Sequence, residues 1–258
     1  MKMNKKWVFP ALAFFAAPAI GEEAWSAPGD QASPFEVEIE GGPVWQSRND
    51  VRIPNDASGT KFSLVDALGS GPYAAGRAYI TWNASERHSC RILLAPLSIT
   101  GTCAFEAPVD FAGEFFAAGA PTKATYRFNS WRATYRYRFG SGEGTAWWIG
   151  FTAKVRDAKI QLDQEGVTAR KTDVGFVPLL NIRGRYRARD RWYFILDIDA
   201  LAGGPGRAED VALELRYDAG GRWRLSGGYR TVEGGADVDA VYSFAWLHYM
   251  VLSAEMRF

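Results

Sequence analysis

The chain is poor in histidine and cysteine, with two of each among its 258 residues. So few imidazoles argue against a histidine-rich metal enzyme, and so few thiols argue against a small domain held together by disulfides. Neither sign of charge is in excess, because 30 Lys and Arg nearly balance 29 Asp and Glu. This balance gives no indication of a nucleic acid as a partner. We therefore expect no cofactor, no metal and no bound nucleic acid.

Long apolar runs are missing after the first 26 residues. A basic start leads into the uncharged, mostly apolar segment 7–20, whose 14 residues are too few to cross a bilayer as a helix. The small residues of Ala24–Ser26 then fit the cleavage site of a secretory signal peptide. We predict a signal peptide over 1–26 and a mature domain over 27–258 without a transmembrane helix. Cleavage after Gly21 is the alternative.

The mature chain is rich in alternation of apolar and polar residues. Phe35, Val37 and Ile39, for example, are separated by glutamates, and many later segments repeat this period of two over about 10 to 15 residues. Such a period is typical of strands with one apolar and one polar face. Strands of this length exceed those of soluble domains and suffice to cross a bilayer. The sequence therefore predicts an all-β fold, a transmembrane antiparallel up-and-down β-barrel.

The alternation and the turn residues together place ten strands, an even number as bacterial barrels require. The expected strands are 34–46, 75–84, 90–103, 123–139, 145–160, 171–188, 191–202, 209–218, 222–233 and 242–258. Eight strands is the alternative. Long loops are expected at one end of the barrel, over 47–74, 104–122, 161–170, 203–208 and 234–241, and short turns at the other. Because the apolar face changes within the fourth strand, we also predict a β-bulge near Asn129 and Ser130.

The last strand carries the most specific signal. Phe258 ends the chain, and the residues at every second position before it are apolar back to Met250. This pattern resembles the C-terminal signature by which bacterial outer-membrane β-barrels are recognised by their assembly machinery. The resemblance is to a class, the small porin-like or omptin-sized barrels of eight to ten strands, and to no specific family. It implies a monomer in the Gram-negative outer membrane, with membrane lipids, lipopolysaccharide and the barrel assembly machinery as partners and Phe258 as the assembly signal.

Charged residues follow the polar faces of the predicted strands and are expected to line the lumen. They are Glu36, Glu38, Arg136, Arg138, Arg156, Arg185, Arg187, Asp197, Asp199, Glu214, Arg222, Arg224, Arg230 and Glu255. In a narrow barrel these groups must pair, because an unpaired buried charge is very costly. The sequence thus predicts either a structural barrel with a salt-bridged lumen or, from the excess of arginine, a narrow porin-like channel.

An enzyme acting on lipid A or peptides is an alternative, although the non-enzymatic interpretation is favoured. Asp197 and Asp199 share one inward face and are candidate catalytic carboxylates, with His248 as a candidate base. Omptins, the outer-membrane proteases, use acidic residues and a histidine, but this sequence lacks their Asp-x-His pair. His248 also has the lipid-facing parity of Phe258. We therefore expect the two aspartates to neutralise an arginine of the lumen, Arg156 or Arg230.

Further candidate groups lie near the predicted turns and loops. His88 and Ser89 are weakly similar to the histidine and serine of outer-membrane lipid A deacylases, but adjacent strand residues point to opposite faces. An acidic loop, Glu233, Asp237 and Asp239, has the oxygen ligands that Ca²⁺ takes, although a solvated loop is the favoured interpretation. A surface-binding barrel acting through such loops is a third hypothesis.

The two cysteines lie on one predicted strand. Cys90 and Cys103 are 13 residues apart, which corresponds to about 43 Å along an extended strand. A disulfide requires Cα atoms within about 7 Å. The predicted topology therefore excludes a bond between them.

Overall fold

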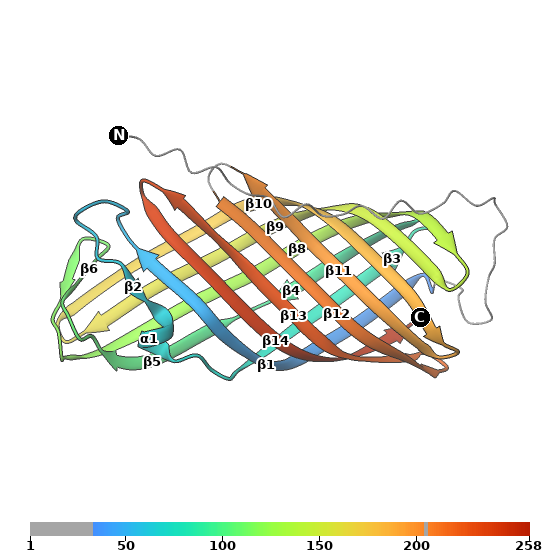
Figure 1. Cartoon of the computed structure of the whole chain (residues 1–258), viewed down its shortest axis with the longest axis horizontal. Helices are drawn as coiled ribbons and strands as arrows, with labels where there is room; N and C mark the ends of the chain where they lie inside the picture. Colours follow the sequence, from blue (N-terminus) through green and yellow to red (C-terminus); the bar gives the residue numbers. More distant parts are fainter. Residues whose placement is uncertain (1–32, 204–205) are drawn as a thin grey trace.

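The computed structural model describes residues 33–203 and 206–258, which form antiparallel strands with one short helix (Figure 1). The predicted signal peptide lies outside the described residues. The elements are β1 (Phe35–Arg52), β2 (Phe62–Ser63), α1 (Leu64–Leu68), β3 (Tyr73–Asn83), β4 (His88–Ala95), β5 (Ser98–Ala104), β6 (Val109–Phe111), β7 (Glu114–Phe116), β8 (Pro121–Gly142), β9 (Thr145–Gln164), β10 (Val167–Arg189), β11 (Trp192–Gly203), β12 (Gly206–Gly220), β13 (Trp223–Val238) and β14 (Val241–Arg257).

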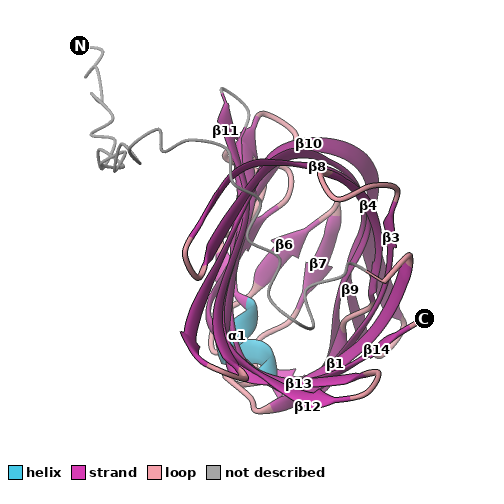
Figure 2. Cartoon of the chain, turned by 90° about the vertical axis from the view of Figure 1, so that its right-hand side faces the viewer, coloured by secondary structure: helices cyan, strands magenta, loops and turns pink. Residues whose placement is uncertain are grey.

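The strands close into a ring, because β14 pairs with β1 as well as with β13 (Figure 2). β4 and β5 act as one strand of this ring, since both pair with β8 in a common register, Ala95 opposite Ser130 and Ser98 opposite Arg127. The ring therefore has ten members: β1, β3, β4 with β5, β8, β9, β10, β11, β12, β13 and β14. The predicted ten-stranded barrel is confirmed, and the eight-stranded alternative is excluded.

The outer face of the ring is apolar over a broad belt. Ile39, Phe176 and Leu252 lie on it, with 59%, 64% and 73% of their surface exposed. They alternate along their strands with side chains that point inward, as the period of two predicts. Among the described residues, no helix is long and apolar enough to cross a membrane.

The two ends of the barrel differ. The turn end carries the short connections 84–87, 143–144, 190–191 and 221–222 and the C-terminus, whereas the cap end carries the long connections 53–72 and 105–120. Three of the predicted loops are wrong, because β9–β10, β11–β12 and β13–β14 continue as paired hairpins toward the cap end. Only Glu165–Gly166 separates β9 from β10. The outward residues of these extensions are polar, so apolar alternation did not mark them, although backbone pairing needs no apolar side chain.

An apolar core fills the inside of the barrel at the cap end. It is formed by α1, the β6–β7 hairpin and the inner faces of the adjoining strands (Figure 2). Among its fully buried members are Leu64, Ile99, Phe111, Phe116, Leu162 and Leu247. We call this group the cap core.

The cap core explains why the fourth predicted strand changes its apolar face without a bulge. In β8, Asn129 pairs with Asp157 and Ser130 with Arg156 in unbroken register, so the bulge predicted here is wrong. Tyr126 points inward and packs in the cap core, whereas Trp131 and the later apolar residues point outward. The side-chain pattern changes because the interior itself changes from charged to apolar along the barrel.

Both cysteines are free thiols. Cys90 is exposed on β4, and Cys103, at the far end of β5, packs against the cap core. The prediction that they are not bonded to each other is confirmed.

Candidate functional site

The middle of the barrel interior is filled by charged side chains that pair across the lumen. Asp210 on β12 accepts hydrogen bonds from Arg77 on β3, Arg132 on β8 and Arg230 on β13, at 3.1, 2.7 and 2.8 Å. Glu40 on β1 pairs with Arg230 at 2.9 Å. All five side chains are less than 10% exposed. Because Asp210 on β12 is shared by guanidinium groups from β3 and β8 as well as from the neighbouring β13, this layer fastens opposite walls of the barrel together.

A second charged layer lies nearer the turn end. Glu38 pairs with Arg91 at 2.6 Å and accepts a hydrogen bond from Ser253 at 2.7 Å. Glu255 pairs with both Arg216 and Arg224 at 2.8 Å. These contacts join β1, β4, β12, β13 and β14. The two layers together occupy the lumen between the turn end and the cap core.

Asp197 and Asp199 both point into this network from β11. Asp197 is held by Arg136 at 2.7 Å and Arg183 at 2.9 Å. Asp199 is held by Arg132 at 2.8 Å and by the hydroxyl of Thr152 at 2.7 Å. These carboxylates are therefore occupied by donors, an arrangement suited to holding walls together rather than to activating a substrate.

The partners predicted for Asp197 and Asp199 were wrong. Arg156 pairs instead with Asp173, and Arg230 pairs with Asp210, Glu40 and Glu214.

The other predicted lumen residues lie nearer the rim or outside the network. Arg138 pairs with the exposed Glu86 at 3.5 Å, and Arg187 lies 3.9 Å from the exposed Asp190. Arg185 lies over the rings of Trp148 and Tyr193. Arg222 lies in the exposed turn before β13 rather than inside the barrel, because the strand starts one residue later than predicted.

Several central residues were not singled out from the sequence. They are Glu40, Arg77, Arg91, Arg132, Arg183, Asp210 and Arg216. The alternation contained a signal for some of them, since Glu40 shares the face of Glu36 and Glu38, and Arg132 shares the face of Arg136.

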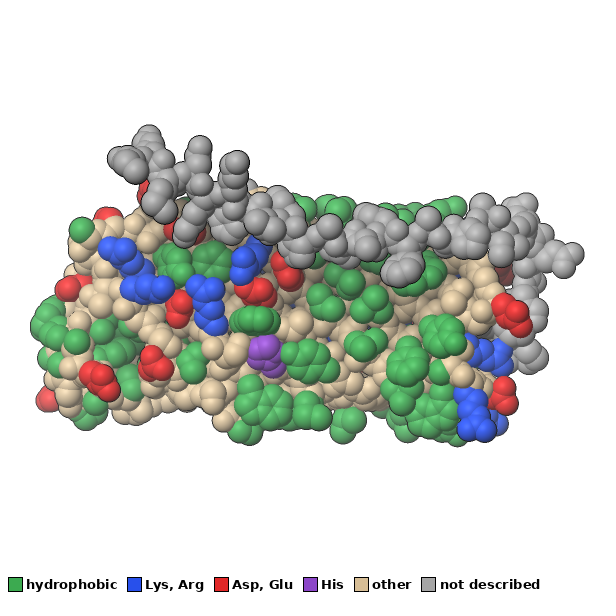
Figure 3. All heavy atoms as spheres, viewed as in Figure 1, with side chains coloured by type: hydrophobic (Ala, Val, Ile, Leu, Met, Phe, Trp, Pro, Cys, Tyr) green, Lys and Arg blue, Asp and Glu red, His purple; other side chains and the backbone are tan. Residues whose placement is uncertain are grey.

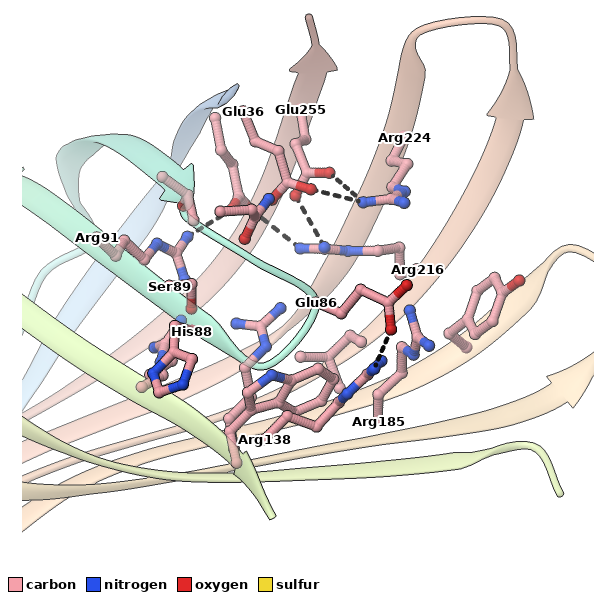
Figure 4. A pocket seen from close by; sticks show the side chains of 18 of the residues that line it. Glu36, Glu86, His88, Ser89, Arg91, Arg138, Arg185, Arg216, Arg224 and Glu255 are labelled. Atoms are coloured by element: carbon pink, nitrogen blue, oxygen red, sulfur yellow. Dashed lines mark hydrogen bonds and ion pairs between the residues drawn. The ribbon is translucent and has the colours of Figure 1, made fainter. Parts of the chain in front are cut away.

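A vestibule opens at the turn end, with a volume of about 1020 Å³ including the solvent at its open side (Figure 4). Arginines outnumber carboxylates along its lining. Figure 4 shows Arg216 and Arg224 reaching Glu255 on one wall and Arg138 reaching Glu86 on the other. Its inner boundary is the layer of Glu38 and its partners.

His248 lies outside the lumen, on the outer face of β14, in agreement with its predicted parity. Its Nε2 is 2.7 Å from the hydroxyl of Ser47 on β1, and its Nδ1 is 2.5 Å from the hydroxyl of Tyr229 on β13. His88, in contrast, lies at the turn end beside the hydroxyl of Tyr135, and Ser89 points to the opposite face.

The acidic loop does not gather into an ion site. Glu233 pairs with Arg207, and Asp237 accepts a hydrogen bond from Asn55. Within residues 33–203 and 206–258 there is no group of three or more metal-ligating side chains.

A closed antiparallel ring with an apolar exterior and a charged interior is the fold of bacterial outer-membrane β-barrels. The resemblance of the sequence to this class is thereby confirmed. The structure is similar to outer membrane protease OmpT from Escherichia coli, with a TM-score of 0.51 and 9% identity over 87% of this chain and 96% of that one.

Two further barrels are more distant. Neisserial surface protein A has a TM-score of 0.39 and 12% identity over 89% of this chain and 100% of its own. The attachment invasion locus protein Ail of Yersinia pestis has a TM-score of 0.36 and 10% identity over 88% and 100%. No protein-family model matches the chain, and no curated protein matches it in sequence. At identities this low, the structural similarity shows a shared fold and says nothing about activity.

Proposed function

We propose that this chain is an integral outer-membrane barrel with a plugged, salt-bridged lumen that does not conduct. Of the two alternatives predicted from the sequence, the structural barrel and the narrow channel, the interior favours the first. The observation that carries this choice is the convergence of Arg77, Arg132 and Arg230 on Asp210 in the middle of the lumen. The cap core adds a second, apolar obstruction at one end.

The proposed orientation places the turn end in the periplasm and the cap end outside the cell. Short turns face the periplasm and longer loops the exterior in barrels of this type. Exposed tryptophans near the turn end, Trp82, Trp192 and Trp223, fit the aromatic girdle of the inner interface. We further propose export by the 1–26 signal peptide, contact with lipopolysaccharide at the outer rim, assembly by the barrel machinery, and a monomeric state.

Single-channel recording in planar bilayers tests the plugged lumen. The purified protein is expected to give no stable unitary current under conditions in which an open porin gives clear steps. The double variant Arg132→Ala with Asp210→Ala removes opposing side chains from the middle layer, and we expect intermittent currents from it. Stable, ion-selective steps from the unaltered protein would overturn the proposal and restore the channel hypothesis.

A further inference from the structure

The outer face of the barrel carries a second group of interacting polar side chains, which takes no part in the charge network of the lumen. Ser47, His248 and Tyr229 come from β1, β14 and β13 and are joined by the hydrogen bonds of 2.7 and 2.5 Å described above. A hydroxyl in contact with an imidazole, whose other nitrogen is oriented by a third group, is the arrangement of an activated serine nucleophile.

A β-bulge presents the serine. In the pairing of β1 with β14, Gln46 lies opposite Leu247 and Arg48 opposite Trp246, so that Ser47 is the extra residue. Gln46 remains buried inside the barrel, whereas Ser47 is exposed on the outer face. Bulges re-aim side chains and are over-represented beside active sites.

Two aromatic rings lie beside the imidazole ring of His248. The ring of Trp246 lies 5.2 Å from that of His248, and the ring of Tyr229 lies 6.1 Å from it, between centroids. Trp246 is itself fixed by a hydrogen bond of 2.7 Å from its Nε1 to the hydroxyl of Thr231. These contacts orient His248 before any substrate arrives, which favours catalysis.

The three residues lie at a boundary on the barrel surface. Along β14 toward the turn end follow Met250 and Leu252, which are 61% and 73% exposed. Toward the cap end lies Arg48, which pairs with Asp50 and donates to the hydroxyl of Tyr242. Figure 3 shows a histidine on this face with apolar side chains toward the turn end and charged side chains toward the cap end. In the proposed orientation this is the level at which lipid acyl chains meet their head groups, and where their ester bonds lie.

We propose that Ser47 and His248 are the catalytic dyad of an esterase that cleaves long-chain acyl esters of outer-leaflet lipids. The inference rests on the proposed membrane placement and goes beyond the plugged lumen. Oγ of Ser47 attacks the ester carbonyl carbon as its proton passes to Nε2 of His248. The bond between the carbonyl carbon and the alcohol oxygen breaks, His248 passes the proton to that oxygen, and the acyl group remains on Oγ of Ser47.

A water molecule completes the cycle. His248 takes a proton from water as the hydroxyl attacks the acyl-serine carbonyl, and returns it to Oγ as the fatty acid leaves. The guanidinium group of Arg48, the next residue along β1, provides a cation beside the phosphate groups that such lipids carry. Tyr229 is a positioning residue, because its hydroxyl contacts Nδ1 and not the reacting atoms.

The test uses the full barrel in detergent micelles, a fluorophosphonate probe and two lipid arms. One arm contains phosphatidylethanolamine and phosphatidylglycerol vesicles and the other purified lipopolysaccharide, with released fatty acids measured by mass spectrometry. We expect phosphonate labelling at Ser47 and fatty acid release in at least one arm, which identifies the lipid source. Ser47→Ala and His248→Ala are each expected to lower release at least about 100-fold.

His88→Ala is the matched control, because His88 also lies beside a tyrosine hydroxyl but at the turn end, and its activity should be unchanged. Tyr229→Phe should lower kcat about 10-fold and leave KM unaltered. Faster migration of unheated protein in gels confirms that each variant is folded. The dyad is overturned if folded, unaltered protein is neither labelled nor active in either arm, or if Ser47→Ala retains full activity. If cell fractionation finds the protein outside the outer membrane but the phosphonate still labels Ser47, the proposed lipid substrate is overturned and the Ser47–His248 dyad is not.

Discussion

Asp210 is the residue on which most of the interior charge converges. Its two oxygens accept hydrogen bonds from three guanidinium groups, and its side chain is 3% exposed. The charge of a carboxylate shared in this way matters to several ion pairs at once, because removing it leaves three buried cations without their common partner.

We predict that Asp210→Asn destabilises the barrel by about 3–5 kcal/mol, the cost of breaking a buried ion pair. The measurement is denaturant unfolding of the refolded protein in detergent, followed by tryptophan fluorescence. Asp173→Asn is the matched control, since Asp173 also pairs with an arginine but is 53% exposed, and its cost should stay below about 1 kcal/mol. Equal unfolding midpoints for the two variants would contradict the role assigned to Asp210.

The partners of individual charges were not predictable from the sequence, although several of the charges were. Asp197 and Asp199 were placed on an inward face by alternation alone. Their arginines come from β4, β8 and β10, at separations of up to 106 residues. Which side chains meet across a lumen depends on the tilt and stagger of all ten strands, and no local pattern records these quantities.

The helix α1 shows how a single strand residue anchors the cap core. Gln46 on β1 is buried, and its side-chain amide donates to the backbone carbonyl oxygens of Leu64 and Gly69 at the two ends of the helix. The helix has five residues, too few to be stable by itself. It therefore depends on this anchor and on the apolar contacts of the cap core.

We predict that Gln46→Ala loosens connection 53–72 and makes it sensitive to protease, while the barrel itself stays intact. Limited proteolysis with mass mapping should find new cleavage within this connection, at a rate raised about 5-fold for a loss of about 1 kcal/mol. Gln161→Ala is the control, because among the described residues Gln161 hydrogen-bonds on the outer face, to Lys159 and Asp163. Cleavage rates that do not differ between the two variants would argue against the anchor.

Strand boundaries could be predicted from the sequence where the outer face of the strand is apolar. The prediction failed where the outer face is polar. The last predicted strand, 242–258, differs from β14 by one residue at each end. β9 and β10, in contrast, extend past the predicted ends through residues such as Gln161 and Arg170, whose outward side chains are polar. Ser47 was assigned to a loop for the same reason, so its contact with His248 could not be predicted.

For the molecule as a whole, we expect the predicted assembly signal, Phe258, to matter for assembly of the barrel and not for the stability of the finished fold. It is 50% exposed, and its backbone N–H donates to the carbonyl oxygen of Phe35 at 2.9 Å, a bond that any residue could make. Its side chain therefore contributes little to the finished fold.

We predict that Phe258→Ala lowers the amount of folded barrel in outer membranes several-fold and leaves refolding in detergent unchanged. Heat-modifiable mobility in gels reports both quantities. Phe35→Ala is the control, because Phe35 is equally exposed at the same end of the barrel but is not C-terminal. A comparable loss in cells for both variants would mean that exposed aromatic surface, and not a terminal signal, is what matters.

The carboxylates of β1 meet arginines of β12 and β13, close to the other end of the chain. Because β1 meets β13 only through β14, we expect these groups to be separated and hydrated until β14 pairs with β1. We therefore expect water to leave the interior when β14 pairs with β1, and this pairing to be most favourable when Glu38 and Glu40 lie opposite these arginines. A seam displaced by one residue would turn both glutamates toward lipid. We therefore expect the buried charges to select the correct register of β14 against β1, because a wrong register leaves them without partners.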